Sequence, residues 1–149
     1  MSALKVSAIR QRLAAHLAAG LTGWRESKYS ADFFGVDGKN PGPLAFAVGA
    51  PGTGSYQGPG QDRQRLTEGT LTSTILVVKS SHRLRDDSHL ADYDAALDAE
   101  QLLVARAMTM DQTDLEFRWL PSASRQSQAN GQWLLIETLF RVDHRYPLT

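Results

Sequence analysis

The chain has 149 residues, of which 42% are hydrophobic and 21% are charged, a length and composition typical of one soluble globular domain. Sixteen Lys and Arg residues balance sixteen Asp and Glu residues, which argues against a dedicated nucleic-acid binder because such a protein needs a basic surface. The absence of cysteine excludes disulfides, thiolate metal sites and cysteine nucleophiles. We therefore expect a single domain over residues 1–149 that is stabilised by packing alone.

An amphipathic helix is predicted at the start of the chain. Val6, Ile9, Leu13 and Leu17 recur at spacings of three and four and so share one helical face, and Gly20 ends the pattern. Arginine and histidine interrupt the apolar residues, so the segment does not read as a signal peptide. No run approaches the roughly 20 apolar residues of a membrane span, and we expect no membrane association.

Turn residues dominate residues 20–43, and we expect an irregular segment there, pinned to the body by Trp24 and by Phe33 and Phe34. A short strand is predicted at residues 43–49, bounded by Pro and Gly. Residues 50–63 are almost wholly Gly, Pro, Ser, Gln and Thr, which predicts a long polar loop because this composition buries little apolar surface.

A long strand is predicted over residues 67–84, which are rich in Thr, Val and Ile. Residues 90–108 then predict the second helix, preceded by three candidate N-cap residues. Its expected buried stripe consists of Leu90, Tyr93, Leu97, Val104 and Met108. The N-cap candidates are Asp86, Asp87 and Ser88.

The last part of the chain predicts a hairpin. Residues 115–120 alternate apolar and polar side chains, residues 124–133 predict a polar loop in which Asn130-Gly131 is a strong turn signal, and residues 133–146 alternate again. The apolar positions of both strands are expected to face inward, and the charged ones, Asp143 among them, outward. The simplest packing that buries every apolar stripe is an α+β domain, with a mainly antiparallel sheet and two amphipathic helices on one of its faces.

No catalytic, cofactor or metal site is predicted. The Gly-rich stretch lacks the lysine of a phosphate-binding loop. His82 and His89 flank one turn and are interpreted as exposed loop residues, with a shared metal as the alternative. Ser80 precedes His82 by two residues, but a nucleophile and its base must meet in space. A small hydrolase that uses His82 or His144 therefore remains an alternative, and the favoured prediction is that the chain is not an enzyme.

Several segments together resemble the tail terminator, or tail completion, proteins of siphophage-type tails and related gene transfer particles. They span nearly the whole chain in the expected order. The most specific combination is DYDAALDAE followed by a terminal strand that ends in HRYPL. The other matching segments are VSAIRQRLAAHL, GWRESKY, DFFG, LAFAVGAP, EGTLTSTILVV with HRLR, and WLLIETLFRVDHRYPL.

The resemblance implies a structural virion protein at the head-proximal end of the tail, assembled in the host cytoplasm. Six copies would form a ring that caps the tail tube and joins it to the head-completion proteins of the neck. DNA would pass through the central channel without sequence-specific binding, and the protein would need no cofactor. A neck stopper or connector protein is the alternative within the same class.

A closed ring needs two different patches of each subunit to meet. We expect strands 66–84 and 132–146 to supply one of them, in part by strand-edge pairing between subunits. The candidate interface residues are Lys79, Arg141 and Arg145, and the two arginines are expected to face acidic residues of a neighbour. The polar residues expected near the channel are Asp62, Gln64 and Glu68.

Overall fold

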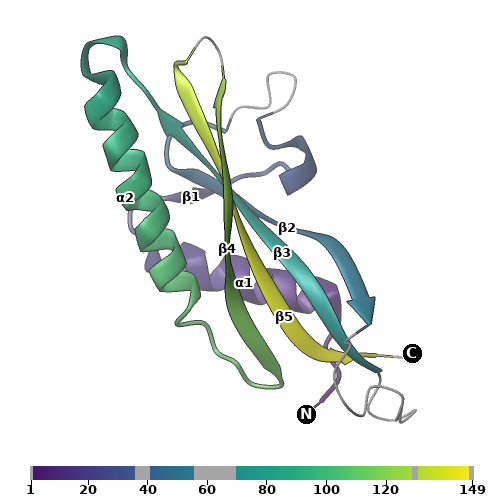
Figure 1. The fold of residues 1–149 in the computed structure, drawn as a ribbon. Coiled ribbons are helices and arrows are strands. Elements are labelled where there is room, and N and C mark those ends of the chain that lie inside the picture. The colour runs from purple at the N-terminus through teal and green to yellow at the C-terminus, as the bar shows by residue number, and fades with distance from the viewer. Residues whose placement is uncertain (1, 36–40, 56–69, 129–130, 148–149) are drawn as a thin grey trace.

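The residues that the structure describes form one five-stranded sheet with two α-helices (Figure 1). The computed structural model describes residues 2–35, 41–55, 70–128 and 131–147. None of the helices in these ranges is long and apolar enough to cross a membrane. The elements in chain order are α1 (Val6–Gly20), β1 (Arg25–Glu26), the 3₁₀ turn η1 (Ala31–Phe33), β2 (Ala45–Ser55), β3 (Thr70–Arg83), the 3₁₀ turn η2 (Asp86–Ser88), α2 (His89–Ala107), β4 (Leu115–Gln128) and β5 (Trp133–Tyr146).

The strands lie in the order β1-β2-β3-β5-β4. All neighbouring pairs are antiparallel except the two-residue β1, which runs parallel to the start of β2. The β3–β5 ladder is continuous from Thr70 opposite Tyr146 to Arg83 opposite Trp133. Both of these strands are interior, whereas β4 is an edge strand. The prediction of a single α+β domain with a mainly antiparallel sheet is confirmed.

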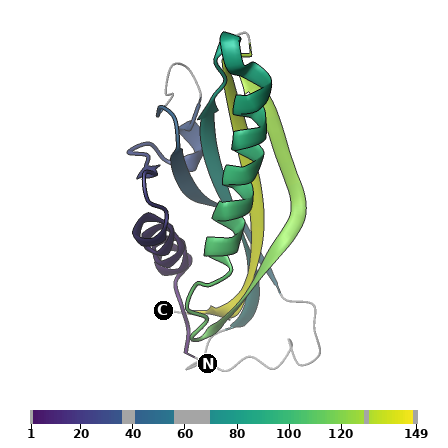
Figure 2. The same cartoon turned by 90° about the vertical axis from the view of Figure 1, so that its left-hand side faces the viewer.

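The main hydrophobic core lies between the helices and one face of the sheet. Ile9, Leu13 and Leu17 of α1 and Leu103 of α2 belong to it, and α2 runs along the strands (Figure 2). The rings of Phe117 and Phe140 stack at its centre, with centroids 4.8 Å apart. The strand members occupy alternate positions, as a pleated strand requires; they are Phe46, Val48, Leu76, Val78, Leu115, Phe117, Phe140 and Val142.

The two helices differ in how well their buried faces were predicted. The α1 stripe is buried as expected, apart from Val6, which is only half-buried. In α2 the prediction was wrong at the two ends of the stripe, because Leu90 is 74% exposed and Met108 is 38% exposed. Tyr93 and Val104 are partly buried against the hydrophobic clusters, as expected. The fully buried positions are Ala96, Glu100, Leu103 and Ala107. Alanine at the contact lets the helix approach the sheet closely, so the largest apolar residues need not face inward.

Two segments that were predicted as loops are strands. β2 continues to Ser55 and pairs with β3 through residues 52–55, and β4 continues to Gln128 and pairs with β5. Each continuation follows a register shift, between Gly49 and Gly52 in β2 and between Leu120 and Ser124 in β4. Backbone pairing with a neighbouring strand outweighs the low strand preference of Gly, Ser and Gln, because strand preference depends strongly on context.

The segment before β2 is held by two of its three expected anchors. Phe34 is fully buried, and half-buried Trp24 packs against the main core. Phe33 is 60% exposed, so its expected role was wrong. Phe34, which directly follows η1, packs against the sheet instead. It belongs to a second hydrophobic cluster with Ala31, Ala45, Ala47, Val77 and Leu135.

The start of α2 is stabilised in a different way from the one predicted. Ser88 occupies the N-cap position, but its side chain makes no capping hydrogen bond. Its hydroxyl donates instead to Asp92 in the first turn of α2, at 3.1 Å. Arg85 donates to the same carboxylate from its backbone and its guanidinium, and these bonds hold the pKa of Asp92 well below its usual range.

Truncating the centre of the core should be costly. Replacing Phe140 with Ala removes a fully buried ring that stacks on Phe117, and we expect the free energy of unfolding to fall by about 3–5 kcal/mol. Leu90→Ala is the control, because this side chain is 74% exposed and its loss should change stability by less than about 0.5 kcal/mol. Urea denaturation of both variants measures the difference, and equal losses would contradict the burial described.

Candidate interaction surface

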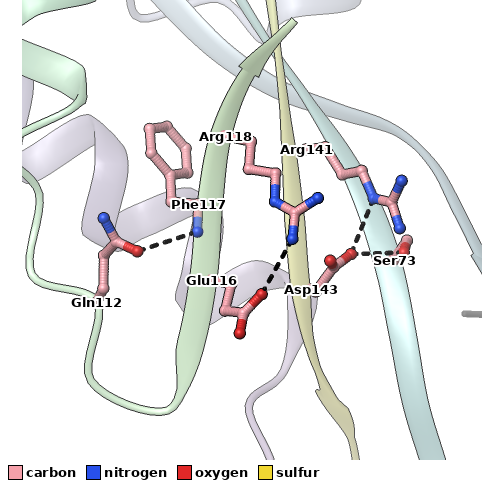
Figure 3. A network of polar contacts seen from close by, with 7 residues as sticks. All are labelled: Ser73, Gln112, Glu116, Phe117, Arg118, Arg141 and Asp143. Atoms are coloured by element: carbon pink, nitrogen blue, oxygen red, sulfur yellow. Dashed lines mark hydrogen bonds and ion pairs between the residues drawn. The ribbon is translucent and has the colours of Figure 1, made fainter. Parts of the chain in front are cut away.

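The sheet face opposite the main core carries a cluster of charged side chains (Figure 3). Glu116 and Arg118 come from β4, and Arg141 and Asp143 come from β5. These positions alternate with the core residues of the same strands, so they point to the other side of the sheet. Figure 3 shows them in front of the strands, with α1 behind. The alternation had predicted this outward direction.

The strand register places like charges opposite each other in this cluster. Arg118 lies across from Arg141, and Glu116 lies across from Asp143. Each arginine is neutralised along its own strand: Arg118 lies 3.3 Å from Glu116, and Nε of Arg141 donates to Asp143 at 2.9 Å. The result is a row of two arginines beside a row of two carboxylates, which is a patterned surface with little net charge.

Asp143 differs from the other residues of the cluster because it is buried. Its side chain is only 6% exposed, whereas that of Glu116 is 61% exposed. The hydroxyl of Ser73 on β3 donates to Asp143 at 2.6 Å, and Arg141 donates to the same carboxylate oxygen. A buried carboxylate needs such donors to offset its lost hydration. The expected outward direction of Asp143 was right, and the contacts with Ser73 and Arg141 bury it on that face.

Sequence patterning missed Ser73 as a member of this cluster. It lies opposite Asp143 in the β3–β5 ladder, and that register is a property of the paired strands. Its neighbours Thr72 and Thr74 are buried. Alternation within β3 is therefore the only sequence signal that could have indicated the sheet face on which Ser73 lies.

The three predicted interface residues lie on β3 and β5. Lys79 pairs with Glu137 at 3.8 Å, Arg141 pairs with Asp143, and the backbone carbonyl of Arg145 accepts a hydrogen bond from Leu4. Contact between these side chains and acids of a neighbour remains a prediction. Strand-edge pairing through these strands was wrong, because both are interior and already pair on their two sides. The predicted channel residues Asp62, Gln64 and Glu68 lie outside the described residues.

His82 is buried, so its interpretation as an exposed loop residue was wrong. It lies near the end of β3, shares a 2.9 Å hydrogen bond with Ser80, and meets the ring of Trp24 edge-on. Burial lowers the pKa of His82 to about 4. The geometry joins a hydroxyl to an imidazole, but Ser80 is 1% exposed and His82 is 4% exposed. His82 lines a depression of about 310 Å³, but Ser80 is not among the residues that line it.

Each of the other histidines forms a hydrogen bond in a different part of the fold. His144 shares a 2.7 Å hydrogen bond with Thr74, and burial lowers its pKa. His16 contacts the end of α2, and His89 contacts the backbone of Gly131. His82 and His89 thus have different partners and do not form the shared metal site that was weighed. Within the ranges that the structure describes, no three His, Asp or Glu side chains are placed to hold a metal ion.

The two carboxylates of the charged cluster should differ in their effect on stability. Asp143→Asn weakens the contacts with Ser73 and Arg141, and we expect the free energy of unfolding to fall by about 1–3 kcal/mol. Glu116→Gln is the matched control, because exposed ion pairs contribute less than about 1 kcal/mol. Denaturant titration at neutral pH compares the two variants. Equal stability of both would show that the burial of Asp143 is energetically unimportant.

The buried imidazole predicts a loss of stability in acid. The pKa of His82 is about 4 in the folded chain against 6.5 for the free side chain, so between these values the unfolded chain binds the extra proton. Stability should be complete above pH 6.5, fall as the pH drops toward 4 by on the order of 3 kcal/mol, and lose no more through this group below pH 4. His82→Gln should make this fall in stability shallower and leave the part that is due to the buried His144. A profile unchanged by His82→Gln would contradict this assignment.

A scan of known protein families finds no model that matches this chain, and a search of curated proteins finds no matching protein.

Proposed function

We propose that the chain is a structural tail terminator. Six copies form a ring on the head-proximal end of a siphophage-type tail tube, and this ring joins the tube to the head-completion proteins of the neck. The sequence resemblance along nearly the whole chain motivates the proposal. The protein acts by assembly without turnover, and DNA passes through the ring.

The observation that carries the proposal is the unlike character of the two sheet edges. One edge is β4, and the other is β2, partly covered by the two-residue β1. A ring of identical subunits requires a heterologous contact, in which one patch meets a different patch of the next copy. Two different strand edges on opposite sides of one domain supply such a pair of patches.

The charge pattern also favours an assembly role. Arginines and carboxylates alternate along β4 and β5 on the sheet face opposite the main core, and the chain as a whole has no net charge. A mixed pattern gives specificity for a protein partner, whereas tight retention of DNA needs clustered positive charge. A channel with balanced charge lets a duplex pass, and we place Asp62, Gln64 and Glu68 beside it.

The enzyme alternative gains little from the buried pair of Ser80 and His82. A general base near neutral pH needs a pKa close to the working pH, and burial lowers that of His82 to about 4. A neck stopper or connector has the same need for two unlike edges, so binding to the tail tube is what separates it from a terminator.

Imaging the protein on tail tubes tests the proposal. Tubes assembled from the tail tube protein of the same particle, without other tail proteins, are mixed with the chain and analysed by electron cryomicroscopy. We expect a ring of six copies at one end of the tube, around a channel about 20 Å wide or more, which a DNA duplex requires. Tails detached from mature particles are the control and should bind no further copies. A chain that stays monomeric or dimeric and ignores the tubes would overturn the proposal.

A further inference from the structure

The outer edge of β2 is only partly covered within the described residues. β1 pairs with Ala45 and Phe46 and ends there, and the backbone N–H of Ser27 donates to the Phe46 carbonyl at 2.7 Å. The Phe46 carbonyl therefore faces outward, and two residues later so does the carbonyl of Val48. Arg10 of α1 donates a side-chain hydrogen bond to that Val48 carbonyl at 3.2 Å.

A depression of about 620 Å³ lies along this part of β2. It is lined by residues 26–32, by residues 47–51 of β2, by Val77 of β3 and by Arg10. The depression runs along the part of β2 beyond β1 and extends onto the sheet face opposite α1, where Ala47 and Val77 lie. An added strand in this position would meet the outward backbone groups of Val48.

The outer edge of β4 has a corresponding arrangement. The backbone N–H of Phe117 donates to the side chain of Gln112 at 3.2 Å (Figure 3), so Phe117 directs its backbone groups away from β5. By alternation the N–H and the carbonyl of Trp119 also face outward. Pro121 follows at the next outward position and has no N–H to donate, which is a common feature of edge strands.

The strand directions allow the two edges to meet. Each strand from β2 through β3 and β5 to β4 reverses direction, so β2 and β4 run antiparallel to each other. A second copy placed beside the first in the same orientation brings its β4 next to β2 of the first copy. These two strands then run antiparallel to each other. Its helices then lie on the same side of the sheet. A ring repeats this one contact at every boundary.

We propose that β4 of one copy pairs with the edge of β2 beyond β1 in the next copy, with Trp119 opposite Val48. The inference rests on the proposed ring. In this register Trp119 and Val48 exchange two backbone hydrogen bonds, and Arg10 gives up the Val48 carbonyl. The paired segment ends at Pro121, where the register of β4 against β5 shifts. In the proposed register Pro121 lies opposite Phe46, which already pairs with β1.

The side chains at this contact are compatible with the pairing. Trp119 is 44% exposed and shares its face with Leu115 and Phe117 of the core. In a continuous sheet it therefore lies on the α1 side, where the released guanidinium of Arg10 can stack on its ring. Pairing also covers one of the largest exposed apolar side chains of the described residues, which monomeric proteins seldom leave on an edge strand.

Cross-linking tests the juxtaposition directly, because the chain contains no natural cysteine. Cysteines are introduced at Ala50 and Glu116, which are both exposed and lie one position from direct opposition in the proposed register. Within one chain they are separated by three strand spacings, roughly 14 Å, so a short bismaleimide joins two chains. We expect the double variant A50C/E116C to give a ladder of oligomers, a mixture of the single variants to give dimers, and each single variant alone to give neither.

A backbone test complements the cross-link. Trp119→Pro removes an N–H that faces away from β5 and leaves the internal ladder intact, whereas Trp119→Thr removes the ring but keeps the N–H. We expect Trp119→Pro to reduce cross-linking between A50C and E116C at least tenfold, and Trp119→Thr to reduce it less. Circular dichroism checks that both variants are folded, and Leu102→Lys, which alters an exposed side chain of α2, is the control for surface changes.

The outcomes separate this inference from the proposed function. A six-membered ring on tail tubes without the A50C–E116C ladder would overturn the pairing and leave the terminator role standing. A ladder in concentrated protein that does not bind tubes would support the pairing and overturn the terminator role. Cross-linking by a single variant would show a two-fold contact and overturn the pairing, as would the absence of a ladder with and without tubes.

Discussion

The continuous pairing of β3 with β5 is the constraint on which the other features depend. The ladder runs from Thr70 to Arg83 without a register shift, while the neighbouring pairs on both sides are interrupted. An uninterrupted ladder fixes which side chains point to each face over its whole length, because a slip of one residue would exchange the faces. The core, the charged cluster and the two edges are therefore positioned relative to these two strands.

This ladder also explains why polar side chains are buried on both faces of the sheet. His144 meets Thr74 on the helix side, and the next residue, Asp143, meets Ser73 on the other side. Both of these buried side chains have a partner supplied by the facing strand, which offsets the cost of removing them from water. The pairing therefore builds the hydrophobic core and, one residue away, a preorganised charged surface.

The two edges share two features that bear on assembly. A side chain of the same chain satisfies an outward backbone group at each edge: Arg10 at the carbonyl of Val48 and Gln112 at the N–H of Phe117. A proline follows in each strand, Pro51 in β2 and Pro121 in β4. Such features limit uncontrolled pairing of exposed edges, and they leave a short segment for a specific contact. A side-chain hydrogen bond can be exchanged for a backbone one at little net cost, since both states are satisfied.

Local sequence patterns by themselves determined the elements whose period is strong. The stripe of Ile9, Leu13 and Leu17 and the alternation in residues 133–146 predicted α1 and β5, because regular apolar spacing has only one face to bury. The tertiary structure decided what depends on a partner: the strand order, the extension of β2 and β4 through Gly and Ser, and the buried face of α2. It also decided that Ser73 meets Asp143 and that His82 is buried. These features depend on contacts between residues far apart in the chain, and local periodicity contains no information about which distant segment lies opposite.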